Sequence, residues 1–224
     1  MTGIIIQARM GSTRLPGKIL KPLVNKNILE HIFYRLSFLQ HEVKVILATS
    51  DSSKDDVVEG FCKTKNVDCF RGSENNVLER YYLCAKKNGF QNVIRLTGDN
   101  PFTDIEELDN LISFFENKKL DFANSFSVMP VGVGAEIFTF KALEDSYING
   151  KLPHHLEHVD EYLIENPRLF KTGILHVPIT KNFPKVRLTI DTPEDFRKAE
   201  LILKHAKSEF VKTEEAIQLC LQFA

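Results

Sequence analysis

The stretch that decides the fold is Gly3-Ile-Ile-Ile-Gln-Ala-Arg-Met-Gly-Ser-Thr-Arg-Leu-Pro-Gly-Lys18. Its first four residues form an apolar, β-branched run that is too short for a helix core, which predicts a buried strand. The cations Arg9, Arg14 and Lys18 follow, together with two hydroxyls and two glycines. A strand that runs into such a loop is typical of phosphate sites in open α/β folds, because glycine lets the backbone approach the anion while amides and cations neutralise it.

Two familiar phosphate motifs do not fit this loop. A Walker A loop has four residues between its glycines and a hydroxyl residue after the lysine, whereas Gly11 and Gly17 are separated by five residues and Ile19 follows Lys18. A dinucleotide fingerprint needs G-x-G-x-x-G, and the loop has no G-x-G. The alternative is an ordinary basic surface loop. The ordered run of glycine, hydroxyls, arginine, Pro-Gly and lysine behind a strand argues against that alternative.

The composition of the 224-residue chain suits one soluble globular domain. The net charge of −1 gives no overall field toward nucleic acid or a membrane, so neither is expected as a partner. Four cysteines without C-x-x-C spacing indicate neither a zinc site nor a disulfide framework, and we expect them to be reduced and mostly buried. The sequence shows neither a membrane span nor a signal peptide, so we expect a cytoplasmic enzyme.

The rest of the chain alternates apolar runs with amphipathic segments. This alternation predicts a three-layer, Rossmann-like α/β sandwich with a mainly parallel sheet. His31 and Arg35, on the far side of the first helix, are expected to be solvated. Between residues 125 and 180 the alternation loosens, and we expect a smaller lid, dimerisation or acceptor subdomain within the single domain 1–224. Strands are expected at 3–6, 43–48, 67–70, 92–97, 120–124, 135–140, 172–177 and 186–190, and helices at 27–39, 52–65, 76–88, 103–118, 141–149 and in two segments after 192.

Polar residues follow several of the predicted strands. In an open parallel sheet the carboxyl ends of the strands are where ligands bind, so Ser50, Arg71 and Asp99 are candidates, and Arg80 is expected to face the same site. Gly98-Asp99 offers a turn and a hard oxygen ligand for Mg²⁺. For Ser50 a helix cap, and for Asp99 an Asx turn, are the structural alternatives.

The segment Pro153-His-His-Leu-Glu-His-Val-Asp160 is the richest polar cluster outside the strand ends. From His154 to His158 it matches H-x-x-E-H, an inverted zinc-protease pattern. Substrate contact, a helix cap or polar helix face, and metal binding are the three interpretations, and a match this short favours metal least.

Three motifs together carry a family resemblance. Gln7-Ala-Arg9 with Gly11-Ser-Thr-Arg-Leu-Pro-Gly-Lys18, Leu96-Thr-Gly-Asp99-x-Pro101 and Arg187-Leu-Thr-Ile-Asp-Thr-Pro-Glu-Asp195 closely resemble motifs of the cytidylyltransferases that activate acidic sugars. The nearest resemblance is to the branch named for spore-coat polysaccharide biosynthesis protein F. It extends over nearly the whole chain and is weakest within residues 125–185, which leaves the identity of the sugar open.

The resemblance implies a GT-A-like nucleotidyltransferase architecture, a homodimer, and transfer from CTP to a sugar, an acidic or amino sugar, with Mg²⁺ as cofactor. It implies a second metal carboxylate, Asp191, beside Asp99. Under this interpretation the catalytic residues are Arg9, Lys18 and Asp99. Acceptor contacts are assigned to Glu136, His155, Glu157 and His158. Nucleotide contacts are assigned to Gln7, Ala8, Arg9, Gly11, Ser12, Thr13, Arg14, Lys18, Ser50, Arg71 and Asp99.

Three alternatives stay open at this stage. A GT-A-like glycosyltransferase would share the sheet, although Asn100 and Pro101 after Asp99 leave its usual Asp-x-Asp incomplete. A guanylyltransferase of the same fold would use GTP, and base choice is not readable from the sequence. A nucleotide-binding regulator without catalysis is disfavoured because both candidate metal carboxylates are present.

Overall fold

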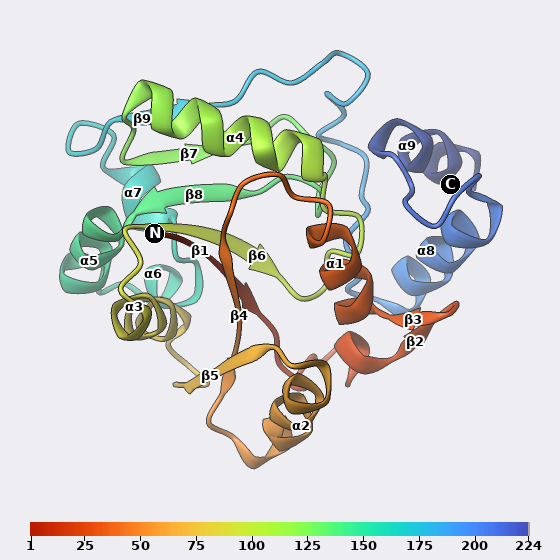
Figure 1. The fold of residues 1–224 in the computed structure, drawn as a ribbon, viewed down its shortest axis with the longest axis horizontal. Helices are drawn as coiled ribbons and strands as arrows, with labels where there is room; N and C mark the ends of the chain where they lie inside the picture. The colour runs from red at the N-terminus through yellow and green to blue at the C-terminus, as the bar shows by residue number, and fades with distance from the viewer. Residues whose placement is uncertain (224) are drawn as a thin grey trace.

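Within residues 1–223, which the computed structural model describes, seven strands form one twisted sheet (Figure 1). Their order across the sheet is β5-β4-β1-β6-β8-β7-β9. All are parallel except β8, which is antiparallel to both of its neighbours. The prediction of a mainly parallel α/β sheet is therefore confirmed. The strands are β1 (Thr2–Gln7), β4 (Lys44–Ser50), β5 (Asp68–Gly72), β6 (Asn92–Thr97), β7 (Phe122–Asn124), β8 (Glu136–Thr139) and β9 (Thr172–Ile174).

Helices cover both faces of this sheet. Side chains alternate along the central strand β1, so Ile4 and Ile6 pack into a core with α1, α2, α4, α8 and α9, while Ile5 packs into a second core with α3 and α5. Figure 1 shows α3, α5 and α6 on one side of the strands and α1, α8 and α9 on the other. The result is the expected three-layer sandwich. The helices are α1 (Ile28–Leu36), α2 (Asp56–Lys65), α3 (Val77–Asn88), α4 (Ile105–Lys118), α5 (Phe140–Asn149), α6 (Pro153–Glu157), α7 (Glu161–Glu165), α8 (Pro193–His205) and α9 (Thr213–Gln222).

Helix α1 begins with a capping box, as Asn27 and Glu30 predict. The Asn27 side chain accepts from the Glu30 amide at 2.9 Å, and the Glu30 carboxylate accepts from the Asn27 amide at 2.8 Å. The prediction that His31 and Arg35 are solvated is wrong, since both are buried. Arg35 donates to the carbonyls of Thr103 and Val211, because the C-terminal segment covers this side of the helix.

The predicted strand at 186–190 is also wrong. The segment is extended, but its backbone partners are loop residues: Leu188 donates to the Val131 carbonyl at 2.9 Å and Ile190 donates to the Asp99 carbonyl at 3.0 Å. One isolated bridge, between Val131 and Arg187, is formed instead of a ladder. The segment therefore crosses the carboxyl end of the sheet, and this course brings Asp191 beside Asp99.

The remaining short elements connect the main ones. A hairpin of β2 (Pro22–Leu23) and β3 (Lys26–Asn27) precedes α1, and single 3₁₀ turns, η1 (Lys18–Leu20) and η2 (Ser53–Asp55), precede the hairpin and α2. All four cysteines are free thiols, three of them buried and Cys69 partly so. No helix within residues 1–223 combines the length and apolar character that a membrane crossing would need.

Candidate active site

The ends of β1 and β6 meet closely at the carboxyl edge of the sheet. Gly98 donates its amide to the Gln7 carbonyl at 2.7 Å. A Cβ atom at residue 98 would lie 2.7 Å from the Ala8 Cβ and 3.1 Å from the Gln7 oxygen, so only glycine permits this approach. The contact places Asp99 directly beside the segment that follows β1.

That segment, residues 8–18, is called the basic loop below. Its fold depends on a buried carboxylate, Asp55, which accepts from the Met10 amide at 2.7 Å and from the Ser50 amide at 3.1 Å, as well as from the Ser50 hydroxyl. Gly17 adopts a positive φ of 70° and donates to the Met10 carbonyl at 3.1 Å, which closes the loop and starts η1. Lys18 follows directly as the first residue of η1.

A cavity of about 570 Å³ opens between the basic loop, the β6 end and the extended segment around Asp191. Among residues 1–223 its lining contains six cationic side chains, Arg9, Arg14, Lys18, Arg80, Arg95 and Arg187, against three carboxylates, Asp99, Glu157 and Asp191. The local excess of three positive charges contrasts with the net charge of −1 on the whole chain. A cavity of this size and sign suits a polyanion such as a nucleoside triphosphate. The predicted site residues that line it are Gln7, Ala8, Arg9, Gly11, Ser12, Thr13, Arg14, Lys18, Asp99, Glu157, His158 and Asp191.

Lys18 is one of the residues that line this cavity. Its ammonium donates to Asp99 Oδ2 at 2.8 Å, to Asp191 Oδ1 at 2.9 Å and to the Ile190 carbonyl at 2.7 Å. The residue is 7% exposed, so these three bonds use all three donors of a nearly buried charge.

Asp191 is surrounded by positive charge. Besides Lys18, Arg14 lies 3.1 Å from its Oδ1, and Arg187 pairs with its Oδ2. Burial by itself raises the pKa of the Asp191 carboxyl, but the Lys18 hydrogen bond and the charges of Lys18, Arg14 and Arg187 outweigh it and hold that pKa below its ordinary value. The side chain is therefore an anion throughout the neutral range.

The donor set at this point fits a magnesium ion. Two carboxylates and a backbone carbonyl direct hard oxygen atoms at one position, where the Lys18 ammonium now lies. Oxygen ligands, with one or two of them from carboxylates, are what Mg²⁺ selects in phosphate-transfer sites. Asp99 and Asp191 are thus brought together as the sequence motifs imply, although they are 92 positions apart in numbering.

Ser50 and Arg71 lie outside the lining of the cavity, contrary to their expected place at the nucleotide. The Ser50 hydroxyl is buried and donates a hydrogen bond to the Asp55 carboxylate. The Arg71 guanidinium is directed to the neighbouring turn, where it donates to Asp56 at 2.6 Å, to Glu59 at 3.0 Å and to the Ser52 carbonyl at 2.8 Å. A strand end close to the cavity does not guarantee that the side chain there points into it.

The four expected acceptor residues separate into two pairs. Glu157 and His158 line the cavity, whereas Glu136 and His155 do not. Glu136 is buried on β8 directly opposite Arg95 on β6 and pairs with its guanidinium. Burial and the nearby Asp160 raise the pKa of Glu136 to about 8 in spite of Arg95. Any effect of Glu136 on a ligand therefore passes through Arg95.

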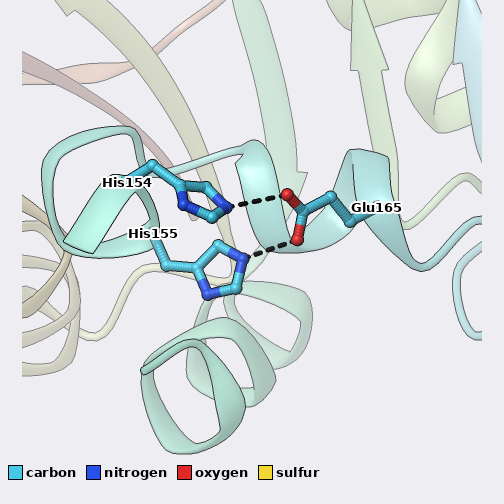
Figure 2. A group of neighbouring side chains, drawn as sticks. All are labelled: His154, His155 and Glu165. Atoms are coloured by element: carbon cyan, nitrogen blue, oxygen red, sulfur yellow. Dashed lines mark hydrogen bonds and ion pairs between the residues drawn. The ribbon is translucent and has the colours of Figure 1, made fainter. Parts of the chain in front are cut away.

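His155 belongs to a separate cluster with His154 and Glu165, drawn in Figure 2. Their potential ligand atoms lie within 4.8 Å of one another, and the Nε2 atoms of the two histidines lie 2.8 and 2.7 Å from the two Glu165 oxygens. The Leu152 amide donates to His155 Nδ1 at 3.3 Å, so the His155 proton is on Nε2. A metal-bound imidazole keeps its proton on the other nitrogen, so this arrangement favours a hydrogen-bonded clasp between α6 and α7 over a metal site.

Several cavity residues were not assigned a role from the sequence. Arg95 and Arg187 are the main ones, with Asn100, Gly132 and Thr189 beside them. A signal for Arg95 was present, because it is the only charged residue in an otherwise strand-like run at 92–97. Arg187 gave a similar signal within Val186–Ile190. Arg80 is 2% exposed and lines the cavity, as expected.

Comparisons with known proteins agree with this arrangement. The family described as Cytidylyltransferase matches residues 3–219. The spore coat polysaccharide biosynthesis protein SpsF of Bacillus subtilis is 37% identical over 207 residues, covering 90% of this chain and 86% of that protein. The 8-amino-3,8-dideoxy-manno-octulosonate cytidylyltransferase of Shewanella sediminis is 31% identical over 53% of this chain and 49% of its own length.

Solved structures show the same fold. A cytidylyltransferase from Leptospira borgpetersenii superimposes with a TM-score of 0.90 at 34% identity, over 99% of this chain and 94% of that one. A CMP:2-keto-3-deoxy-manno-octonic acid synthetase in complex with CTP superimposes with a TM-score of 0.68 at 18% identity, over 91% and 98% of the two chains, and supports the fold alone. With a family match over nearly its full length, a basic cavity at the carboxyl edge of a parallel sheet and paired carboxylates within it, this chain belongs to the cytidylyltransferase family of enzymes.

Proposed function

We propose that this enzyme transfers a cytidylyl group from CTP to a hydroxyl of a sugar and releases pyrophosphate. The observation that carries the proposal is the cluster of six cations around Asp99 and Asp191 in one cavity. A triphosphate has the charge and length to use such a cluster, whereas a binding site for a neutral ligand has no need of it. The name of the Shewanella sediminis relative supports an acidic or amino sugar as acceptor, and that of SpsF supports a role in polysaccharide synthesis.

In the proposed reaction the acceptor oxygen attacks the α-phosphorus of CTP. A new phosphorus–oxygen bond forms, the bond from the α-phosphorus to the bridging oxygen breaks, and pyrophosphate leaves with that electron pair while the hydroxyl proton passes to solvent. Phosphoryl transfer depends chiefly on positioning and on neutralising charge. Arg9 and Arg14 would hold the triphosphate, and the amides and hydroxyls of Gly11, Ser12 and Thr13 would orient it.

Asp99 and Asp191 are the residues that would hold Mg²⁺. When bound, the ion would supply charge neutralisation between phosphates and carboxylates. On the acceptor side, Glu157, His158 and Arg95 line the cavity and would orient the sugar. Residence in the cytoplasm, the homodimer and a lid formed by residues 125–180 stay predictions.

The test is release of pyrophosphate by the purified protein with Mg²⁺ and a panel of acidic and amino sugars. CTP, UTP, GTP and ATP are compared as donors, because the cavity lining does not select a base. We expect release from CTP with at least one sugar. Release from GTP alone would support nucleotidyl transfer but show that CTP is not the donor. No release from any triphosphate would contradict the proposal.

A further inference from the structure

Two expected roles in this site conflict with each other. Lys18 is expected to hold phosphate, and Asp99 and Asp191 are expected to hold a metal ion. In the structure, however, the Lys18 ammonium donates its three hydrogen bonds to Asp99, Asp191 and the Ile190 carbonyl. No donor is left for a phosphate, and the point on which the two carboxylates converge is occupied by nitrogen.

We infer that Lys18 is an exchangeable internal cation, which occupies the metal position in the nucleotide-free enzyme and gives it up when metal and nucleotide arrive together. The geometry of the ammonium carries this inference. It lies 2.8 and 2.9 Å from the two carboxylate oxygens, whereas Mg²⁺ requires oxygen atoms at about 2.1 Å. The same groups serve both cations, but the carboxylates must approach each other as the longer ammonium contacts are replaced.

The charges explain why the site needs a resident cation. Among residues 1–223, Lys18 is the ion-pair partner of Asp99, and Asp191 has Arg14 and Arg187 in addition. Without Lys18 two carboxylates would face each other in a partly buried place, which is costly for at least one of them. The ammonium removes this cost while the cavity holds no ligand.

The consequence is that metal and nucleotide depend on each other for binding. A divalent ion alone must displace Lys18 from three hydrogen bonds without providing a new partner for it. A triphosphate alone must draw Lys18 away and leave the carboxylates uncompensated. When both arrive, the ion satisfies Asp99 and Asp191 and the triphosphate satisfies Lys18. This step rests on the proposed function for the identity of the nucleotide, but the exchange between lysine and metal does not.

The experiment measures Mn²⁺ binding by electron paramagnetic resonance, without nucleotide, in the wild type and in Lys18→Met. We expect Mn²⁺ to bind the variant about tenfold more tightly or better, because a competing positive charge a few ångströms away has been removed. Lys21→Met is the matched control. Lys21 is exposed, stacks on Phe196 at 4.5 Å and lies three residues from Lys18, so its loss should leave Mn²⁺ affinity unchanged.

Further variants keep the test decisive. Lys18→Gln keeps a hydrogen-bond donor without the charge and should show the same gain if the methionine variant does not fold. Adding Asp191→Asn to either variant should remove the gain. Equal Mn²⁺ affinity in wild type and Lys18 variants, or no measurable binding in any of them, would overturn the inference. These outcomes are independent of CTP turnover, so failure of the exchange is distinguishable from failure of the proposed function.

Discussion

Arg95 on β6 and Glu136 on β8 face each other as a cross-strand pair beneath the cavity. Their side chains are 15% and 4% exposed, so the guanidinium and the carboxyl group meet in a nearly buried place in the middle of the sheet. Among residues 1–223, one Glu136 oxygen, Oε2, has no hydrogen-bond partner, and Asp160 lies close by. Arg95 therefore has two roles: it donates a hydrogen bond to the buried Glu136 carboxyl group, and it contributes positive charge to the cavity.

Replacing Arg95 with methionine is expected to destabilise the protein by about 1–3 kcal/mol, because it leaves the buried Glu136 carboxyl group without its hydrogen-bond partner. Adding Glu136→Met to that variant should restore a large part of the stability, since no buried carboxyl group is then left without a partner. Urea unfolding of the two single variants and the double variant measures the coupling. Additive effects would contradict the proposed pairing.

The raised pKa of Glu136 predicts a pH dependence of stability. Its folded pKa of about 8 lies above the ordinary value near 4.3, so the folded protein binds a proton that the unfolded chain has already lost. The Glu136 contribution is fully present below about pH 4 and declines as the pH rises from there to about 8. The unfolding free energy of Glu136→Gln should fall less over this window than that of the wild type. Parallel curves would show that Glu136 titrates at its ordinary pKa.

Asp99→Asn is expected to lower kcat by about 10²–10³, a loss comparable to that of one electrostatic donor in other active sites. It removes the charge that pairs with Lys18, and that the proposed metal ion would use, while keeping the shape of the side chain. Asp68→Asn is the control, because Asp68 is an exposed residue on β5 whose ion pair is with Lys44. The measurement is pyrophosphate release, with thermal melting to confirm folding. Equal turnover in both variants would exclude Asp99 from the chemistry.

Asp55 is expected to act as a positioning residue for the basic loop, although it lies outside the cavity lining. Asp55→Ala removes the acceptor of the Met10 and Ser50 amides, which should cost about 1–3 kcal/mol in stability. It should also raise the KM for the triphosphate about tenfold, because the loop amides would no longer be held for the phosphates. Asp55→Asn, which keeps one acceptor oxygen, should recover part of the KM. A stability loss with unchanged KM would limit Asp55 to a structural role.

Gly98→Ala is expected to destabilise the fold by about 1–3 kcal/mol and to reduce turnover, since the new methyl would force the ends of β1 and β6 apart. Gly60→Ala provides the matched control. A Cβ at Gly60 meets nothing within 4 Å in helix α2, so that change should raise stability by about 0.5–1 kcal/mol. Urea midpoints measure both, and a neutral Gly98→Ala would refute the tight contact.

The resemblance of their motifs to a known family implied that Asp99 and Asp191 act together. The sequence by itself determined the alternation of strands and helices and the position of the basic loop. These features depend on local pattern: β-branched runs, caps such as Asn27–Glu30, and a glycine-rich loop behind a strand. The sequence could not determine in which direction each side chain at a strand end points. Ser50 and Arg71 lie at strand ends like Asp99, but their side chains point elsewhere. The Ser50 hydroxyl donates to Asp55, and the Arg71 guanidinium donates to Asp56 and Glu59.

Only the tertiary structure decided the remaining features, because they depend on contacts between distant segments. Residues 186–190 have the composition of a strand. Their backbone pairs with loop residues and Asp99, however, so they are not part of the sheet. Arg35 is polar on the outer side of its helix, but the C-terminal segment buries it. The three bonds of Lys18 join residues as far as 173 positions apart, so no local pattern could reveal that the loop lysine and the two carboxylates neutralise one another.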